Sequence, residues 1–474
     1  TSEMHLVAAI DHNPAVRPVL GLFEGVVSGA ADGYARMSGK SAANLLHLGP
    51  GLGNAFANIH NAKKAFSPMI NIVGDHASYH LKHNAPLTSD LDGLAKSSSD
   101  WVRRVGSSEQ ITQCANDAWK VANEPPGNIA TLIVPADYAW SNIQSDLPKK
   151  VKLNNRKSVD NKLIEAAYKL LSKPNSMLYL GGKFLDEECL KFAAQIATKT
   201  GCRLVTDTFI SRIRRGAGLP IIQQVPYFSE MAEDFLQGTE SIVFIGTKPP
   251  VSFFAYPDKK SFLSPDEAEL FQLCSVEEDG HEALALLSEL SGSPKIANDL
   301  IRSHISEVPT SGDLDVTTLG PLIADLMPEE SIVSDESATS SLIVTPFALQ
   351  AKPHDWLALT GGSIGQGLPL AIGASIAKPD RPVITLHGDG GAMYTVQALW
   401  TQARENLNIT NIIFSNRSYE ILKIELDRVQ AVETGERAAS MFSMDNPPID
   451  WVNLAESMGV QGYKPKTVKE FKEV

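Results

Sequence analysis

The stretch His387-Gly388-Asp389-Gly390-Gly391-Ala392 decides the fold, because it joins a strand pattern to a helix pattern. An apolar run at residues 382–386 precedes it, and apolar residues at helical spacing follow it. A second apolar run, residues 411–414, ends just before Asn416. Strand, helix and strand in this order form the unit of a parallel sheet. The sequence therefore predicts that Asp389 and Asn416 lie at neighbouring strand ends. The apolar residues of the expected helix are Val396, Leu399, Trp400, Ala403 and Leu407.

These strand ends favour a magnesium-bridged diphosphate. Ligands of open α/β sheets bind beyond the carboxyl ends of strands, and helix N-termini attract anions. Mg²⁺ accepts hard oxygen ligands, which Asp389, Asn416 and the carbonyl of Ser418 can supply. A Gly-Asp-Gly tripeptide alone is more often a turn after a strand, so the prediction depends on its pairing with Asn416. The backbone groups expected close to the diphosphate belong to Gly388, Gly390, Gly391 and Ala392.

Length and composition indicate a large α/β enzyme. The chain has 474 residues, of which 43% are hydrophobic, and this is enough for about three separate cores. A charged stretch at residues 147–157 and a second polar stretch at 307–313 divide it. We expect domains at residues 1–146, 158–295 and 315–474, each a doubly wound parallel sheet. We also expect the chain to begin and end inside a domain.

Charge, hydropathy and cysteine content argue against several classes of partner. A net charge of −13 disfavours nucleic acid and anionic membrane surfaces. No apolar run reaches the length of about 18 residues that a membrane-spanning helix needs, so no span is predicted. The four cysteines lie far apart, without the short spacings of zinc or redox sites. We interpret them as free buried thiols of a cytoplasmic protein.

A second group of candidate residues lies in the first block. Residues 19–23 are strand-like, and Glu24 opens a helix rich in Gly and Ala. A Glu at a helix N-terminus is favourable through the helix dipole alone. The small residues that follow allow another helix to approach closely, as expected at a subunit interface.

Together these motifs resemble the thiamine diphosphate (ThDP)-dependent 2-oxo acid decarboxylase and acetohydroxyacid synthase family. Asp389 and Asn416 are 27 residues apart (416 minus 389), a spacing similar to the family's ThDP-binding motif, although Ser415 replaces its first Asn. Benzoylformate decarboxylase and acetolactate synthase large subunit-like proteins look nearest. The resemblance implies a pyrimidine-binding, a middle Rossmann-like and a diphosphate-binding domain, in this order. The likeness extends over nearly the whole chain through residues 23–37, 45–55 and 361–369.

The resemblance also implies roles for individual residues. Glu24 matches the Glu that hydrogen-bonds the aminopyrimidine ring and promotes loss of the thiazolium C2 proton. Ile364 matches the apolar wedge that keeps the cofactor bent, and the Gly362 carbonyl matches the acceptor of its amino group. Thr339 matches a diphosphate contact, and Tyr419 lies beside that group. Glu24 of one chain is expected to reach the cofactor of another, so a homodimer is the minimal active unit and a homotetramer the expected assembly.

His47 is the candidate for proton transfer to the substrate. It matches an active-site His of benzoylformate decarboxylase, and imidazole titrates near neutrality. A lone His between apolar residues is often a core residue. The Gly-rich loop after His47 indicates a functional site, so the structural and the functional interpretation have about equal weight. His76, His80 and His83 form a further cluster, which we interpret as a polar loop at the rim of the site and not as a metal site. Thr1 matches the Ser or Thr of the family's substrate-side loop.

Three departures from the family leave the substrate open. Phe254 falls near the position of the second active-site His of benzoylformate decarboxylase. Leu422 occupies the position at which pyruvate decarboxylases have a catalytic Glu. Glu425 falls near the position of the Trp that acetohydroxyacid synthases use to favour a larger second substrate. FAD is not expected, because the flavin-contacting segments of those synthases are not recognisable in the middle block.

The sequence thus predicts a ThDP- and Mg²⁺-dependent lyase or transferase, similar to acetolactate synthase. Its reaction makes or breaks the carbon–carbon bond next to the carbonyl of a small 2-oxo acid. Two alternatives remain open: a non-ligating decarboxylase of the benzoylformate decarboxylase type, and a catalytically silent paralogue that binds the cofactor. A nicotinamide dehydrogenase fits less well, because no dinucleotide fingerprint follows a strand.

Overall fold

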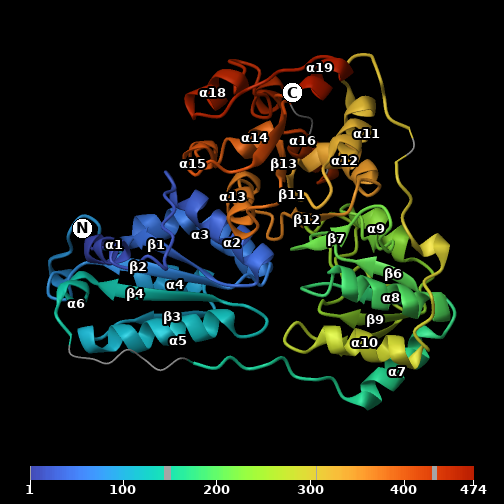
Figure 1. Ribbon diagram of the computed structural model, residues 1–474, viewed down its shortest axis with the longest axis horizontal. Helices are drawn as coiled ribbons and strands as arrows, with labels where there is room; N and C mark the ends of the chain where they lie inside the picture. Colours follow the sequence, from blue (N-terminus) through green and yellow to red (C-terminus); the bar gives the residue numbers. More distant parts are fainter. Residues whose placement is uncertain (1, 144–150, 306, 430–434) are drawn as a thin grey trace.

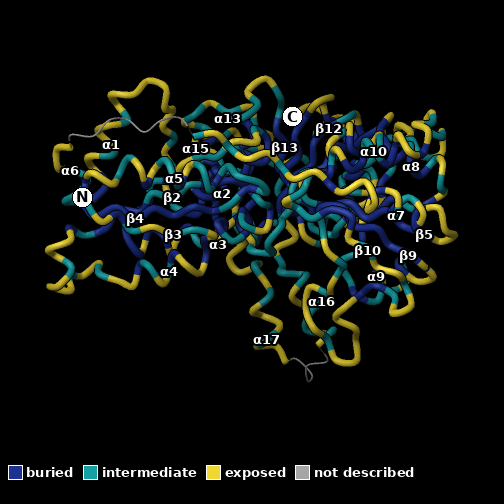
Figure 2. The backbone as a smooth tube through the Cα atoms, turned by 90° about the horizontal axis from the view of Figure 1, so that it is seen from below, coloured by how far each residue is buried: buried dark blue, intermediate teal, exposed yellow. Residues whose placement is uncertain are grey.

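A computed structural model describes residues 2–143, 151–305, 307–429 and 435–474. Within them the chain forms three α/β domains, called the first, middle and third domain, each with a sheet covered by helices (Figure 1). Buried backbone runs through all three sheets, whereas α16 (Glu420–Arg428) and α17 (Glu436–Ser440) project from the body (Figure 2). The predicted linker at 147–157 lies partly, and Thr1 wholly, outside the described residues. Among the described helices none is both long and apolar enough to cross a bilayer.

The first sheet is parallel and has the order β1-β2-β4-β3. Its core combines residues of the sheet with one face of each covering helix, such as Leu46, Ile59 and Ile133. Its strands are β1 (Ala42–His47), β2 (Met69–Asp75), β3 (Trp101–Arg104) and β4 (Ile129–Pro135). Its helices are α1 (Met4–Asp11), α2 (Glu24–Ser38), α3 (Leu48–Lys64), α4 (Leu91–Ser98), α5 (Ile111–Asn123) and α6 (Ala136–Trp140).

The middle sheet is also parallel and has the order β10-β9-β5-β6-β8. All five residues of β5 and of β9 are buried, as expected for central strands covered on both faces. The strands are β5 (Ser176–Leu180), β6 (Arg203–Thr206), β8 (Gln223–Gln224), β9 (Ser241–Ile245) and β10 (Glu269–Cys274). The helices are α7 (Asn161–Leu171), α8 (Glu187–Thr200), α9 (Ser229–Leu236) and α10 (Gly280–Leu290).

The third sheet has the order β14-β13-β11-β12-β7. Its edge strand β7 (Ile213–Arg215) comes from the chain between β6 and β8 and pairs antiparallel with β12. One hydrophobic cluster accordingly runs through the middle and third sheets. The other strands are β11 (Ile332–Glu336), β12 (His354–Ala358), β13 (Val383–Gly388) and β14 (Ile409–Phe414). The other helices are α11 (Val316–Leu326), α12 (Ser341–Ala348), α13 (Gly367–Ala377), α14 (Asp389–Ala392), α15 (Ala398–Arg404), α18 (Trp451–Ser457) and α19 (Val468–Glu473).

The predicted fold class of parallel-sheet α/β domains is confirmed, but two local predictions are wrong. Residues 19–23 form no strand. They lie against α15, where the Thr401 hydroxyl donates to the Leu20 carbonyl, so no neighbouring strand pairs with them. The helix expected after Asp389 is broken into α14 and α15, and Leu407 lies beyond it.

Helix α13 joins the first and third domains. It packs against α2 on one side and against β11 and β13 on the other (Figure 1). The two helices approach so closely that an added Cβ at Gly33 would collide with the Leu370 carbonyl, and one at Gly373 would collide with the Ala30 carbonyl. The small residues of α2 thus serve a close contact within the chain, whereas the sequence pattern suggested a helix of another subunit.

Replacement of Gly33 by Ala is expected to destabilise the protein by about 1–3 kcal/mol, because backbone must shift to admit the methyl group. The matched control is Gly53→Ala in α3, where an added Cβ meets nothing within 4 Å. It is expected to stabilise by about 0.5–1 kcal/mol through helix propensity. Urea unfolding of both variants measures the difference, and equal midpoints would contradict the close packing.

Candidate functional site

Strands β13 and β14 bring the two predicted metal loops together. They pair in parallel register, so Asp389 and Asn416 follow them at one edge of the sheet. The Arg417 N–H donates to Asp389 Oδ2 at 2.7 Å, and the Gly390 N–H donates to Asp389 Oδ1 at 2.9 Å. Asp389 is 3% exposed, and these two backbone donors compensate the burial of its carboxylate. The loops are therefore joined directly, as the sequence predicts.

The second loop carries the other two predicted metal ligands, Asn416 and the Ser418 carbonyl. Asn416 is exposed, and its Oδ1 accepts the Ser418 N–H at 3.0 Å. Arg417 between them has a left-handed backbone with φ of 55°. A buried carboxylate beside an exposed carboxamide and a backbone carbonyl is a donor set that fits Mg²⁺. The close approach at Gly390 also fits, because an added Cβ there would collide with the Tyr419 ring.

A third loop, residues 361–366, carries the predicted wedge. Ile364 is 38% exposed at its tip. Gly362 has φ of 76°, and an added Cβ would lie 2.6 Å from the Phe253 ring of the middle domain. Asn61 of α3 holds the loop from the other side, donating to the Ser363 carbonyl at 2.7 Å. The wedge thus lies where all three domains meet.

Thr339 lies in a short 3-10 helix, Ala338–Ser340, directly after β11. This segment contacts both β13 and α16, so Thr339 belongs to the same edge of the sheet as Asp389. Gly391 and Ala392 are in α14, which begins at that edge. The third sheet therefore brings together the residues that the sequence predicts to bind the cofactor at its strand ends.

Glu24 and His47 flank one glycine of the first domain. Glu24 is the first residue of α2, and its Oε2 accepts from the Asn54 side chain at 3.1 Å. An added Cβ at Gly51 would lie 3.3 Å from both Glu24 Oε1 and the Cβ of His47. The two predicted catalytic residues are therefore close neighbours, brought together by α2, β1 and α3.

Glu3 is a site residue that the sequence did not reveal. Its carboxylate Oε2 lies 2.9 Å from His47 Nδ1, and the Ser2 hydroxyl donates to its other oxygen. Glu3 is 6% exposed, whereas 42% of the His47 side chain is exposed. Only the tertiary structure shows this pairing, since the residues are far apart in sequence. The contact with Glu3 orients the His47 ring through its Nδ1 atom.

The positions that depart from the family lie around a contact between α16 and the middle domain. Glu425 accepts hydrogen bonds from Tyr227 at 3.1 Å and Tyr256 at 2.7 Å. Burial and the Glu425 carboxylate raise the pKa of the Tyr227 hydroxyl. Arg428 pairs with Glu230. Glu425 therefore anchors α16, while Leu422 on the same helix is 46% exposed.

The histidine cluster has no metal-site geometry. The rings of His76 and His80 are 5.4 Å apart between centroids, and those of His80 and His83 are 5.7 Å apart. Among the described residues no group of three His, Cys, Asp or Glu side chains is placed to hold a metal ion. His80 and His83 are exposed in the loop after β2.

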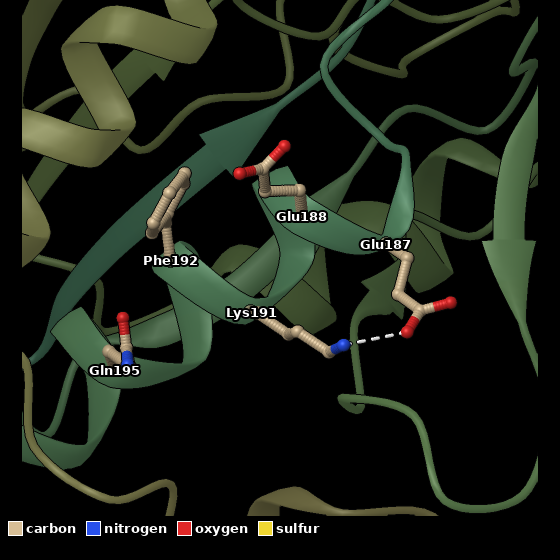
Figure 3. A pocket seen from close by; sticks show the side chains of 5 residues that line it. All are labelled: Glu187, Glu188, Lys191, Phe192 and Gln195. Atoms are coloured by element: carbon tan, nitrogen blue, oxygen red, sulfur yellow. Dashed lines mark hydrogen bonds and ion pairs between the residues drawn. The ribbon is translucent and has the colours of Figure 1, made fainter.

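A surface pocket on α8 lies in the middle domain (Figure 3). Glu187 and Lys191 form an ion pair along the helix at 2.7 Å, and both side chains are about half exposed. Such a pair is solvated and of little energetic weight. None of the predicted cofactor residues lines this pocket, whose lining consists of Glu187, Glu188, Lys191, Phe192 and Gln195.

The fold and the three loops at one sheet edge define a class of α/β enzymes that bind a diphosphate cofactor. Residues 1–95 match the thiamine pyrophosphate enzyme N-terminal TPP binding domain, and residues 338–474 match the C-terminal TPP binding domain. A Mycobacterium tuberculosis protein named "Putative acetolactate synthase large subunit IlvX" is 43% identical, covering 99% of this chain and 90% of that protein. The chain belongs to the thiamine pyrophosphate enzyme family.

Proteins of lower sequence identity also match this chain over nearly its whole length. Benzoylformate decarboxylase of Pseudomonas aeruginosa is 25% identical, over 96% of this chain and 88% of that protein. The structure of a ThDP-dependent 4-hydroxybenzoylformate decarboxylase of Rhodococcus jostii has a TM-score of 0.85 at 24% identity, covering 100% of this chain and 91% of that chain. Benzoylformate decarboxylase of Polynucleobacter necessarius has a TM-score of 0.83 at 22% identity, with the same coverage. Both structures have the fold described above.

Replacement of Asp389 by Ala is expected to abolish the binding of ThDP with Mg²⁺, because the loop loses its metal ligand and the acceptor that joins it to Arg417. The matched control is Asp445→Ala, which removes an exposed carboxylate 3.1 Å from the Arg417 guanidinium. Titration calorimetry with ThDP and MgCl₂ measures both variants. Heat of wild-type size from Asp389→Ala, or loss of heat from Asp445→Ala, would contradict this assignment.

Proposed function

We propose that this chain is a ThDP- and Mg²⁺-dependent enzyme that makes or breaks the carbon–carbon bond next to the carbonyl of a 2-oxo acid. Its reaction is that of an acetolactate synthase-like decarboxylase or carboligase. The observation that carries the proposal is the hydrogen bond from the Arg417 N–H to Asp389, which joins the two metal loops. The relative named as an acetolactate synthase large subunit, 43% identical, supports this type of reaction.

The residues present fit the cofactor and its ion. Asp389, Asn416 and the Ser418 carbonyl would hold Mg²⁺, and Thr339, Gly390, Gly391, Ala392 and Tyr419 would surround the diphosphate. Gly362 and Ile364 would contact the rings. When bound, ThDP supplies a nucleophilic carbon and takes up the electrons released with CO₂.

The chain's own side chains then control protons. Glu24, a carboxylate at the start of α2 that Asn54 holds in place, would exchange a proton with the aminopyrimidine ring of bound ThDP. His47, oriented by Glu3, moves a proton on the substrate side. Both residues lie beside Gly51, where the missing side chain leaves room for them. The first domain thus supplies proton transfer, and the third supplies cofactor binding.

A symmetric dimer completes this division of roles. We propose that Glu24 of one chain serves the cofactor held by Asp389 of the other, so that a homodimer is the minimal active unit and a homotetramer the full assembly. The substrate is a small molecule, and neither nucleic acid nor membrane is a partner. The free, buried thiols of Cys114, Cys189, Cys202 and Cys274 support a cytoplasmic location.

Mixing two inactive variants tests the shared site. Glu24→Gln and Asp389→Ala are each expected to be inactive alone. After subunit exchange, half of the dimers combine one chain of each kind, and one of their two sites has both groups intact. Activity is expected to return to about one quarter of the wild-type value. A mixture that stays inactive despite proven exchange would place both groups in sites of a single chain.

A non-ligating decarboxylase of the benzoylformate decarboxylase type is the second candidate. The observation in its favour is the aromatic pair beside the wedge loop. Phe253 is 40% exposed and touches Gly362, and Phe254 is 52% exposed and stacks edge-on against Phe253 at 4.7 Å. Apolar rings beside the wedge loop favour an acyl donor with an apolar side chain.

Product analysis separates the two reactions. Pyruvate and phenylglyoxylate are each incubated with protein, ThDP and Mg²⁺, and CO₂, acetolactate and free aldehyde are measured. Acetolactate from pyruvate is the expected result, whereas benzaldehyde from phenylglyoxylate without ligation supports the second candidate. Exchange of the cofactor C2 proton followed by NMR tests the silent paralogue. Exchange no faster than in free ThDP, and unchanged in Glu24→Gln, would remove the catalytic proposal.

A further inference from the structure

Glu336 is a buried carboxylate beneath the cofactor loops, at the carboxyl end of β11. It is 6% exposed. Its Oε1 accepts the Gly365 N–H and its Oε2 accepts the Gly367 N–H, both at 2.6 Å. Gly365 directly follows Ile364 in the wedge loop, and Gly367 is the first residue of α13. Hydrogen bonds of backbone amides to a buried carboxylate are short and strong, so this end of the loop is firmly held.

The same carboxylate also faces the metal loop. His387, which is fully buried two residues before Asp389, places its Nε2 3.2 Å from Glu336 Oε2. The other ring nitrogen lies 3.0 Å from the Gly388 carbonyl. An added Cβ at Gly391 would lie 3.0 Å from the His387 ring and 3.3 Å from Glu336 Oε1. Glu336 therefore contacts the wedge loop directly and the metal loop through His387.

The wedge loop is also held by its neighbours: the Thr395 hydroxyl donates to the Gly365 carbonyl at 2.8 Å, and His60 Nε2 lies 3.1 Å from the Gly361 carbonyl. Gly362 and Gly365 have left-handed backbones, with φ of 76° and 97°, and the loop has no regular secondary structure. Asn61 holds Ser363 from the first domain. Ile364 lies between the Asn61 contact at Ser363 and the Glu336 and Thr395 contacts at Gly365, so Glu336 is one of the groups that fix its position relative to Asp389.

We infer that Glu336 is a positioning residue, which sets the wedge Ile364 and the metal loop of Asp389 at the separation that the bent cofactor requires. This inference rests on the proposed function. Glu336 acts through Gly365, Gly367 and His387 and is not assigned any contact with cofactor or substrate. A purely structural carboxylate would affect the stability of the fold alone.

The first test is Glu336→Gln. The Gln side chain keeps the shape, but its amide NH₂ faces a backbone N–H, so one hydrogen bond is lost. Affinity for ThDP with Mg²⁺, measured by calorimetry, is expected to fall about ten- to hundredfold. The matched control is Asp207→Asn in the middle domain, a carboxylate that accepts from Thr247 at 2.7 Å. Cofactor affinity of this control is expected to stay within about twofold of wild type.

A double-mutant cycle separates positioning from general damage. Ile364→Ala removes the wedge itself, so Glu336→Gln should cost less affinity in that background than in wild type. Full additivity of the two losses would overturn the inference, as would wild-type affinity in Glu336→Gln. If wild type itself fails to bind ThDP, the proposed function fails first, which distinguishes the two failures.

Hydrogen exchange of the unchanged protein tests the same point if Glu336→Gln does not fold. The amides of Gly365 and Gly367 are expected to exchange slowly before the cofactor is added, since Glu336 already holds them. Addition of ThDP and Mg²⁺ should slow the rest of residues 361–364 much more than these two amides. Free exchange of both amides without cofactor would overturn the inference.

Discussion

The parallel pairing of β13 with β14 is the constraint on which the site depends. In register, these strands end together, and the chain after β14 turns so that the Arg417 amide meets the Asp389 carboxylate. A buried carboxylate is costly unless donors surround it, and here two backbone amides do so. The metal loop therefore takes its shape from the sheet itself, and the exposed Asn416 is held beside it by local backbone conformation.

The packing of α13 fixes the position of the first domain relative to this sheet. Residues 367–375 of the helix are buried on all sides, which is typical of a helix enclosed between other elements. Its contact with α2 is so close that glycine is required on both helices. The first domain is thus held against the third at one fixed distance. Glu24, at the start of α2, takes its position from that contact.

The placement of the proposed cofactor residues in the third domain was predictable because local order determines it. A strand, a turn with glycines and a helix place Asp389 at a sheet edge, and the next strand places Asn416 beside it, whatever the rest of the fold. Glu3 and Glu336 were not predictable in this way, since their partners His47, Gly365 and His387 are brought close only by tertiary packing.

The two wrong predictions have the same kind of cause. Residues 19–23 have strand-like composition, but a strand needs a free sheet edge, and α15 lies beside this segment instead. The helical spacing after Asp389 continues through the break between α14 and α15. There Thr395 turns its hydroxyl to the Gly365 carbonyl at 2.8 Å, and this contact with the wedge loop replaces helical continuity.

Selectivity for the substrate has a different origin from cofactor binding. The space beside Gly362 is bordered by Phe253, which belongs to the middle domain, and α16 is anchored to that domain through Glu425 and Arg428. The rings beside the wedge belong to the middle domain, and Leu422 lies on a helix anchored to it, whereas the sheet of that domain carries none of the proposed cofactor residues. In the proposed enzyme the loops of the middle domain contribute to the acyl-donor pocket, so their sequence can change the acyl donor while the cofactor motif stays the same. This separation explains why the motif identifies the cofactor so much more sharply than the substrate.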